Sequence, residues 1–412
     1  MTRYALAVVG LVLLLGLLAL AGSAWGAGNT YTVNSTADTN DGSCDALGSA
    51  TDCTLWEAIL EAMISTGTDT VAFNIPVTDP NYGHNTTGVW TIVLTTTLLS
   101  PVDNIVDGTT QATNILSDTN PYGPEIEISG ENLSVGVSCW SIGSNGTIKG
   151  LAINRCPAYG LQVTGDGNTI VGNYIGTDAT GSSDVSTSYD GILVGGGAKN
   201  NTIGGPTEEE RNVISGMGGG IRIFQISGNT TGNVIEGNYI GTDRTGTSPL
   251  GNGYGVRIHG GAHDNTFGPN NVIAYNSGDG VWVDELNTNG NTITQNSIHS
   301  NGDLGIDLTN DGNDSVVAPV ISSNTCASAS GTAPINSTVE LFSGPDDEGK
   351  THLTSVSADG SGNWSAWGFL AGDSYLTATA TDAAGNTSEF SSGAGVVVCD
   401  ERAYLPLTTK KY

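Results

Sequence analysis

Four segments in the second half of the chain carry charged or aromatic side chains at equivalent positions after a Gly. Residues 220–224, 255–259, 280–284 and 305–309 each begin with Gly and an apolar residue. In extended backbone, alternate side chains point to opposite faces, so the polar and aromatic members share the face opposite the apolar ones. Seven residues make up this shared face, called the outer strip below: Arg222, Phe224, Arg257, His259, Trp282, Asp284 and Asp307.

The outer strip combines flat side chains with charges. If the four segments stack as neighbouring strands, consecutive members of the strip lie about 4.8 Å apart. Aromatic rings such as Phe224 and Trp282 can stack on sugar rings, and a guanidinium such as that of Arg222 can hold the carboxylate of a uronate sugar. These three residues are therefore candidate substrate-binding residues for a polysaccharide or cell-surface glycan.

The other four members of the strip, Arg257, His259, Asp284 and Asp307, are candidate catalytic residues. In a lyase or epimerase, Arg257 or His259 would abstract a proton. The two Asp side chains would orient the sugar or protonate the leaving oxygen. Two further interpretations stay open: the strip binds a glycan without turning it over, or it is an exposed face with ordinary Arg–Asp pairs between turns.

A repeated Asn motif predicts the elements that position the strip. An Asn followed two residues later by an aliphatic or aromatic residue recurs in pairs, and Gly-led strands separate the pairs. Repeats with three short strands and no helical pattern predict an all-β fold, a right-handed parallel β-helix, in which each turn of a three-sided solenoid stacks on the next. The pairs begin at Asn168/Asn173, Asn201/Asn212, Asn233/Asn238, Asn265/Asn271 and Asn291/Asn296.

The Gly-led strands also predict the core. Their inward positions are apolar over six turns, and we interpret the Asn columns as structural, at turns between strands. There Asn tolerates left-handed backbone and can bond the next Asn along the stack. The two inward columns are Leu161, Ile192, Ile221, Val256, Val281, Ile306 and Val163, Val194, Ile223, Ile258, Val283, Leu308.

Residues 27–66 are expected to close the N-terminal end of the solenoid. Thr54 and Glu57 form a capping-box pattern at the start of a predicted helix over 55–64, and its apolar stripe includes Met63. Such a helix would cover the exposed sheet edge at the end of a β-helix.

This N-terminal segment resembles the CSLREA domain of secreted bacterial proteins. The resemblance rests on Thr32-Val-Asn-Ser-Thr36, Asp38, Cys44 and Cys53-Thr-Leu-Trp-Glu-Ala-Ile59, with Trp56 where that motif usually has Arg. Motifs further along, such as Gly172-Asn-Tyr-Ile-Gly-Thr-Asp178, also resemble the β-helix region of these proteins. The resemblance covers roughly residues 30–315. It implies an architecture and no catalytic residues.

Beyond the predicted β-helix, residues 67–315, the composition changes. We expect a polar hinge at residues 310–314 and a small β-sandwich over 320–399, with a tail over 400–412. The run Ala378-Thr-Ala-Thr-Asp-Ala-Ala-Gly-Asn-Thr-Ser388 resembles bacterial Ig-like modules of surface proteins. Such modules space or dock a functional domain.

Composition and the N-terminus favour an exported protein. The chain has 41 Asp and Glu against 12 Lys and Arg, a net charge of −29, so nucleic acid is not an expected partner. Residues 1–26 have signal-peptide anatomy, with an apolar run over 5–21, and no later stretch is apolar enough to span a membrane. We expect a secreted, extracellular or cell-surface location.

Export makes disulfides the expected state of the six Cys residues. Proximity favours the pairs Cys44–Cys53, Cys139–Cys156 and Cys326–Cys399.

The predicted groove resembles the grooves of pectate lyase-like β-helix enzymes. Those enzymes use clustered Asp with calcium, an Arg or Lys base, or two or three Asp for hydrolysis. That resemblance leaves calcium open as a cofactor of this chain.

Two near-identical loops, residues 175–181 and 240–246, could form the wall of a groove along the outer strip. Their repetition nevertheless favours a turn role for Asp178 and Asp243.

The expected function is glycan binding or adhesion at the cell surface. A polysaccharide lyase, epimerase or glycoside hydrolase on the same strip is the alternative, and a structural surface component is a second one.

Overall fold

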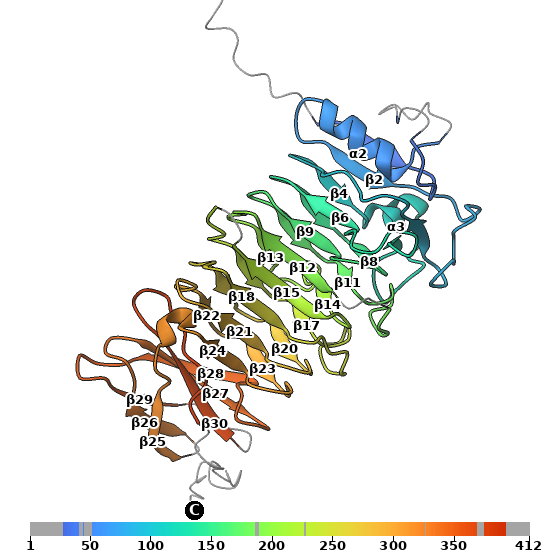
Figure 1. Cartoon of the computed structure of the whole chain (residues 1–412). Helices are drawn as coiled ribbons and strands as arrows, with labels where there is room; N and C mark the ends of the chain where they lie inside the picture. The colour runs from blue at the N-terminus through green and yellow to red at the C-terminus, as the bar shows by residue number, and fades with distance from the viewer. Residues whose placement is uncertain are drawn as a thin grey trace, which may run out of the picture.

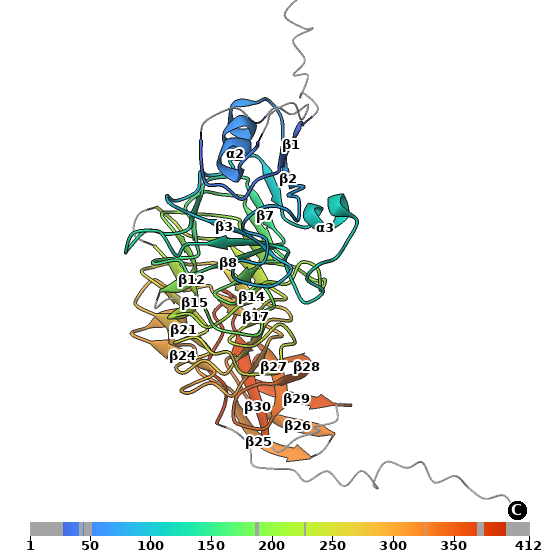
Figure 2. The same ribbon diagram turned by 90° about the vertical axis from the view of Figure 1, so that its right-hand side faces the viewer.

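The computed structural model describes residues 28–40, 44, 52–185, 189–225, 228–325, 327–368 and 375–392. Three parallel sheets, called A, B and C, run the length of a solenoid (Figures 1 and 2). From β4 (Ile105–Asp107) onward the chain visits them in turn, with one short strand in each sheet per turn, which is the predicted right-handed parallel β-helix.

Sheet A contains β1 (Thr30–Val33), β2 (Thr70–Phe73), β4 (Ile105–Asp107), β7 (Thr147–Lys149), β10 (Thr169–Val171), β13 (Thr202–Gly204), β16 (Val234–Glu236), β19 (Thr266–Phe267) and β22 (Thr292–Ile293). Sheet B contains β3 (Trp90–Val93), β5 (Ile126–Ser129), β8 (Leu151–Asn154), β11 (Tyr174–Ile175), β14 (Val213–Ile214), β17 (Tyr239–Ile240), β20 (Val272–Ala274) and β23 (Ser297–His299). Sheet C contains β6 (Trp140–Ile142), β9 (Leu161–Val163), β12 (Asp190–Gly195), β15 (Gly219–Phe224), β18 (Val256–His259), β21 (Val281–Asp284) and β24 (Ile306–Thr309).

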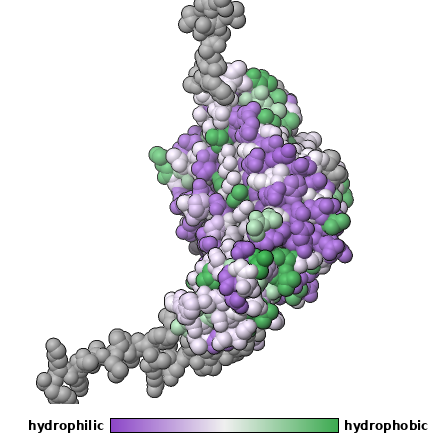
Figure 3. Space-filling view, turned by 90° about the vertical axis from the view of Figure 1, so that its left-hand side faces the viewer, coloured by the Kyte–Doolittle hydropathy of each residue, from purple (hydrophilic) through white to green (hydrophobic). Residues whose placement is uncertain are grey.

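The apolar columns of sheet C form one wall of the core, as predicted. Ile192 pairs with Leu161 and Ile221, and every member of the first column is at most 1% exposed. Among the second column only Leu308, in the last turn, is partly exposed. Hydrophilic residues cover most of the β-helix surface seen in Figure 3, because the alternation sends the polar members of each strand outward.

The two predicted Asn columns are continuous hydrogen-bonded ladders. In the first, the Oδ1 of Asn233 accepts from the backbone N and the Nδ2 of Asn201 at 3.1 and 2.8 Å, and Asn233 donates to Asn265 in the same way. The second ladder runs in the same manner from Asn173 to Asn296. Each buried amide therefore satisfies two donors of the preceding turn.

The expectation that the ladder Asn residues adopt left-handed backbone was wrong. The left-handed residue is in most turns the one directly before the ladder Asn, as at Asn200, Asp264 and Asn270, or a Gly such as Gly232. This residue makes the corner, and the Asn after it can then point its amide along the stack. Gly, Asn and Asp are the residues that tolerate this backbone best.

A third ladder links the ends of sheet B strands to sheet C. Asn252 donates to Asn276, and Asn276 donates to Asn301. It was not predicted, since its first member does not have the spacing of the other two. Its last acceptor is not an Asn but Glu348 of the C-terminal module, which accepts from Asn301 Nδ2 at 3.0 Å.

The predicted N-terminal helix is α2 (Leu55–Ile64), and both hydrogen bonds of its capping box are present. Its apolar side packs on the first turn of the solenoid through Leu55, Ala58, Ile59 and Ala62, whereas Met63 is 40% exposed. A second helix, α3 (Thr110–Ile115), was not predicted and lies between β4 and β5.

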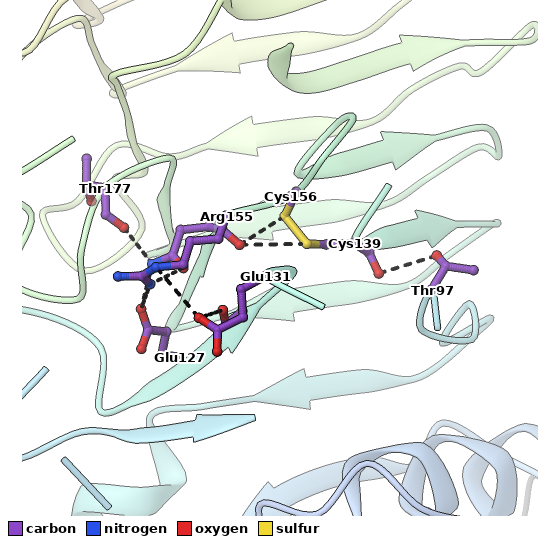
Figure 4. The surroundings of a disulfide bond; sticks show 9 residues. Thr97, Glu127, Glu131, Cys139, Arg155, Cys156 and Thr177 are labelled. Carbon is purple, nitrogen blue, oxygen red and sulfur yellow. Dashed lines mark hydrogen bonds and ion pairs between the residues drawn. A yellow bond between two sulfur atoms is a disulfide. The ribbon is translucent and has the colours of Figure 1, made fainter. Parts of the chain in front are cut away.

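Two of the predicted disulfides are present. Cys44–Cys53 closes a loop of the N-terminal cap, and Cys139–Cys156 joins neighbouring turns. Beside the second bridge, Arg155 donates to the buried Glu127 at 2.7 Å (Figure 4). The expected Cys326–Cys399 pair lies outside the described residues, as do residues 1–26 and the tail.

The C-terminal module contains two three-stranded antiparallel sheets, which agree with the predicted small β-sandwich. One sheet is ordered β25-β26-β29 and the other β28-β27-β30. Their strands are β25 (Val320–Thr325), β26 (Ser328–Thr332), β27 (Thr338–Gly344), β28 (Thr351–Ser357), β29 (Asn363–Trp367) and β30 (Tyr375–Thr381).

The predicted hinge at residues 310–314 is instead a docked segment. It leads into a 3-10 helix (Gly312–Ser315), and the fully buried Asn313 ends the first Asn ladder by accepting from Asn291 N at 3.1 Å. Asn313 Nδ2 also donates to Thr387 O, in the C-terminal module. A polar run looks like a hinge in sequence, but here its polar atoms are satisfied by the last turn.

Carboxylates of the C-terminal module take the place of a further turn. Glu340 accepts from Gln295 N, Asp346 from Ser300 N, and Glu389 from Leu308 N, at 2.9 to 3.1 Å. These backbone donors would otherwise lack partners at the end of the solenoid. Among the described residues, none of the helices is long and apolar enough to cross a bilayer.

We predict that Asn233→Ala destabilises the fold by on the order of 3 kcal/mol, because it leaves buried donors of Asn201 without acceptors. Urea unfolding of the full chain measures this change. Asn229→Ala is the matched control, because Asn229 is exposed. A loss of unfolding free energy in Asn233→Ala no larger than that of the control would contradict the account of the ladders.

We also predict that docking of the C-terminal module strengthens in mild acid. Burial, with the charges of Asp346 and Asp347, raises the pKa of Glu348 to about 7 from the ordinary 4.5. The folded state therefore holds a proton that the unfolded state releases, so stability rises as pH falls from about 8 toward 4.5, by roughly 1 to 3 kcal/mol. Unfolding of wild type and Glu348→Gln across this range should show a larger rise in wild type, since other carboxyls with raised pKa values, such as Asp307, are common to both proteins; equal pH profiles would contradict the role of Glu348.

Candidate functional site

The structure brings the outer strip together on the outer face of sheet C. Arg222 pairs in register with Arg257, Arg257 with Trp282, and Trp282 with Asp307. In the second column, Phe224 pairs with His259. The predicted register is therefore correct for all four segments, and the chemical roles of the seven residues stay predictions.

Arg257 is the centre of the most connected part of the strip. Its Nη2 lies 3.0 Å from Asp284 Oδ2, and its guanidinium lies 3.9 Å above the centre of the Trp282 ring. Thr309 and Asn310 also donate to Asp284 Oδ1, and Trp282 Nε1 donates to Thr309. Arg257 thus covers one face of the indole.

These contacts decide the charge state of Asp284. Burial alone would raise the pKa of this carboxyl, but the hydrogen bonds from Asn310, Thr309 and Arg257 hold it below its ordinary value. Asp284 is ionised at neutral pH, and its oxygens are occupied by these donors. An arginine held by a carboxylate and an indole is a poor proton acceptor.

Arg222 is held by two residues that the sequence analysis missed. Its Nε lies 2.8 Å from Asp190 Oδ2, and it donates to the hydroxyl of Tyr254, which donates in turn to Asp190 Oδ1 at 2.5 Å. Burial alone would lower the pKa of Arg222, but Tyr254 and Asp190 raise it above its usual value.

The alternation along the strands does not assign Asp190 and Tyr254 to the outer strip. Each directly precedes the Gly of a Gly-led strand and lies two residues before an inward residue, Ile192 or Val256, so a period of two places both on the inward side. Their side chains nevertheless reach the outer face beside Arg222.

His259 is stacked face to face on Phe224, with ring centres 4.2 Å apart. Burial, with the charges of Arg257 and Arg222, lowers its pKa to about 4. The imidazole is therefore neutral at neutral pH, and its Nε2 has no hydrogen-bond partner among the described residues. A neutral imidazole can accept a proton, although the low pKa makes it a weak base.

Asp307 belongs to a different electrostatic environment. Burial and the charges of Asp279, Glu389 and Asp284 raise its pKa to about 6. The strip thus ends in an acidic corner near the C-terminal module. No group of three or more His, Cys, Asp or Glu side chains within the described ranges is arranged to hold a metal ion, and calcium stays an untested expectation.

The two repeated loops fold back onto their own strands. Gly181 packs against Tyr174 and Gly246 against Tyr239, both in sheet B, and a Cβ on either Gly would lie within 2.7 Å of the ring. Asp178 and Asp243 accept backbone N–H groups within their own turns. The turn role is confirmed, and these contacts place the loops over sheet B, so they do not support a wall along the strip.

Comparison with known proteins identifies no relative by sequence. No family model and no curated protein matches the chain. Among solved structures, one similar chain is pectate lyase Pel9A, with 15% identity and a TM-score of 0.30 over 69% of this chain and 78% of that chain. A TM-score this low carries no argument about the site, and the fold rests on the strand pairing described above.

We predict that the His259 ring titrates near pH 4 and shows no transition between pH 6 and 8. Removing a neighbouring charge in Arg257→Gln should raise this pKa. Because the folded-state pKa lies below the unfolded value of 6.5, His259 supports stability above pH 6.5, and this contribution is lost as pH falls toward 4. NMR titration of the imidazole measures the pKa, and a wild-type value near 6.5 would refute the described packing.

Proposed function

We propose that this chain is an exported protein that binds a neutral glycan along the outer strip without turning it over. The observation that carries the proposal is the stacked Arg257–Trp282 pair on a rigid sheet, with Asp284 fixing the guanidinium. A guanidinium held in place loses little conformational entropy when sugar hydroxyls accept its remaining N–H groups.

The charge balance of the strip favours a neutral glycan over a uronate polymer. Arg222 and Arg257 are each paired with a buried Asp, at 2.8 and 3.0 Å, so neither presents an uncompensated positive charge. Asp307 adds negative charge, and the whole chain carries −29. A polyanion would be repelled at long range, whereas hydroxyl groups would not.

A glycoside hydrolase on the same strip is the second candidate. It is favoured by the separated pKa values of two carboxyls, since Asp284 is held below its ordinary value and Asp307 is raised to about 6. Such a separation is what an acid and base pair requires. We rank it second because the oxygens of Asp284 already accept from Arg257, Thr309 and Asn310.

Export and the domain assignment belong to the same proposal. Two disulfides among the described residues support an oxidising compartment. We propose that residues 1–26 are a signal peptide, that 27–66 are a CSLREA-like cap on the β-helix of 67–315, and that 320–399 are an Ig-like module. In this arrangement the module both ends the solenoid and connects it to the cell surface.

We predict that Trp282→Ala weakens glycan binding by about tenfold or more, because Arg257 loses the ring that holds it. A glycan array identifies the ligand, and calorimetry with wild type and variant measures the change. Trp367→Ala is the control, since Trp367 is 73% exposed and lies in the C-terminal module.

The same preparation separates the rival functions. Binding without release of new reducing or unsaturated ends supports the proposal, and turnover supports the enzyme. Ordered self-association with no glycan bound would favour a structural surface component. Equal affinity of Trp282→Ala and wild type would rule out the strip as the binding site.

A further inference from the structure

The corner between sheets A and B carries two insertions with a gap between them. Residues 108–125, which include α3, connect β4 to β5, and residues 205–212 connect β13 to β14. In the two turns between these insertions the same connection is short: Gly150 alone connects β7 to β8, and Gly172-Asn173 connects β10 to β11. Three strand spacings of about 4.8 Å separate β4 from β13, so the insertions stand apart and enclose a recess of about 360 Å³.

The walls of this corner recess combine carboxylates with an apolar surface. Asp118, Glu125, Glu208 and Glu209 line it, together with the Tyr174 ring, Pro121 and Pro124. The helix α3, which supplies part of one wall, projects from the side of the solenoid in Figure 2. The recess lies at the corner where sheet A meets sheet B, whereas the outer strip lies on the outer face of sheet C. The two are therefore separate surfaces.

The lining of the recess has a negative charge balance because it contains four carboxyl side chains and one guanidinium, that of Arg211. Arg211 Nε donates to Gly237 O at 3.2 Å, and its guanidinium lies 4.3 Å above the Tyr239 ring. Glu210 turns away to accept from Thr207. Glu208 and Glu209 line the recess and are exposed.

Glu125 supplies an independent indication of a cation. It is 6% exposed, and its Oε1 accepts from Thr119 N and Oγ1 at 2.7 and 3.1 Å. Its Oε2 is buried and has no hydrogen-bond partner among the described residues. Burial and the nearby charge of Asp118 raise the pKa of this carboxyl. An unpartnered buried acceptor is costly, and the positive charge of a cation in the recess that Glu125 lines would offset this cost.

We propose that the corner recess binds an organic ammonium ion. The ammonium group lies among the carboxylates of Asp118, Glu125 and Glu208 or Glu209, and the carbon body packs on Tyr174 and the two prolines. A hard metal ion fits less well: calcium takes six to eight oxygen ligands, and no set of three metal-ligating side chains occurs among the described residues. A neutral sugar would leave the negative charge uncompensated.

Calorimetry of the full chain with hexane-1,6-diamine as the probe tests the proposal. We expect saturable one-site binding at low salt that weakens as salt rises, and no binding of hexane-1,6-diol, the neutral isostere. Glu208→Gln/Glu209→Gln should weaken diamine binding by at least about tenfold without changing thermal unfolding, because both side chains are exposed.

The control is Glu61→Gln/Asp347→Asn, which removes the same charge far from the recess. Unchanged diamine affinity in this control supports a site at the recess. Equal weakening in the two double variants would mean that net charge alone attracts the probe, and it would overturn the proposal. Equal affinity for the diol would overturn it as well.

Discussion

The structure depends on one recurrent interaction, the hydrogen bond from the backbone N–H and side-chain amide of one ladder Asn to the Oδ1 of the next. A parallel β-helix with strands as short as two residues, such as β14 and β17, leaves many corner N–H groups inside the molecule. The three ladders satisfy these groups at each corner, and buried backbone donors without partners would otherwise cancel much of the gain from the apolar core. The stack can therefore extend only as far as each turn finds a partner beyond it.

That constraint explains both ends of the molecule. At the start, Asp69 and Asn104 occupy the place of ladder residues and accept from Asn29 N and Asp69 N. At the finish, Asn313, Glu340 and Glu348 accept the donors of the last turns. The C-terminal module is thus a structural completion of the solenoid, and its carboxylates explain part of the acidic composition without reference to a ligand.

The repeat made the core and the outer strip predictable, because a period of two and a repeated Gly together determine which face each residue occupies. Ile192, Ile221 and Val256, and their outward neighbours Arg222 and Arg257, followed from that rule alone.

Features outside the repeat were not predictable in this way. The helix α3 is short and lacks a side-chain cap, and the Asn252 ladder follows an irregular spacing. Asp190 and Tyr254 reach Arg222 from positions before the Gly, and such contacts between side chains of different turns depend on rotamers that no periodicity encodes. Whether the strip binds a glycan follows from neither the repeat nor the fold.

A rigid stack also gives the outer strip its character, since each planar group rests on a neighbour one turn away, Arg257 on Trp282 and His259 on Phe224. The surface is prepared before any ligand arrives, which favours recognition over a conformational mechanism. Hydrogen–deuterium exchange with a saturating oligosaccharide tests this most directly. The account predicts added protection in residues 219–225, 254–260 and 280–286, with little change in the rest of the described chain. Protection confined to another face, or a broad change across the solenoid, would contradict it.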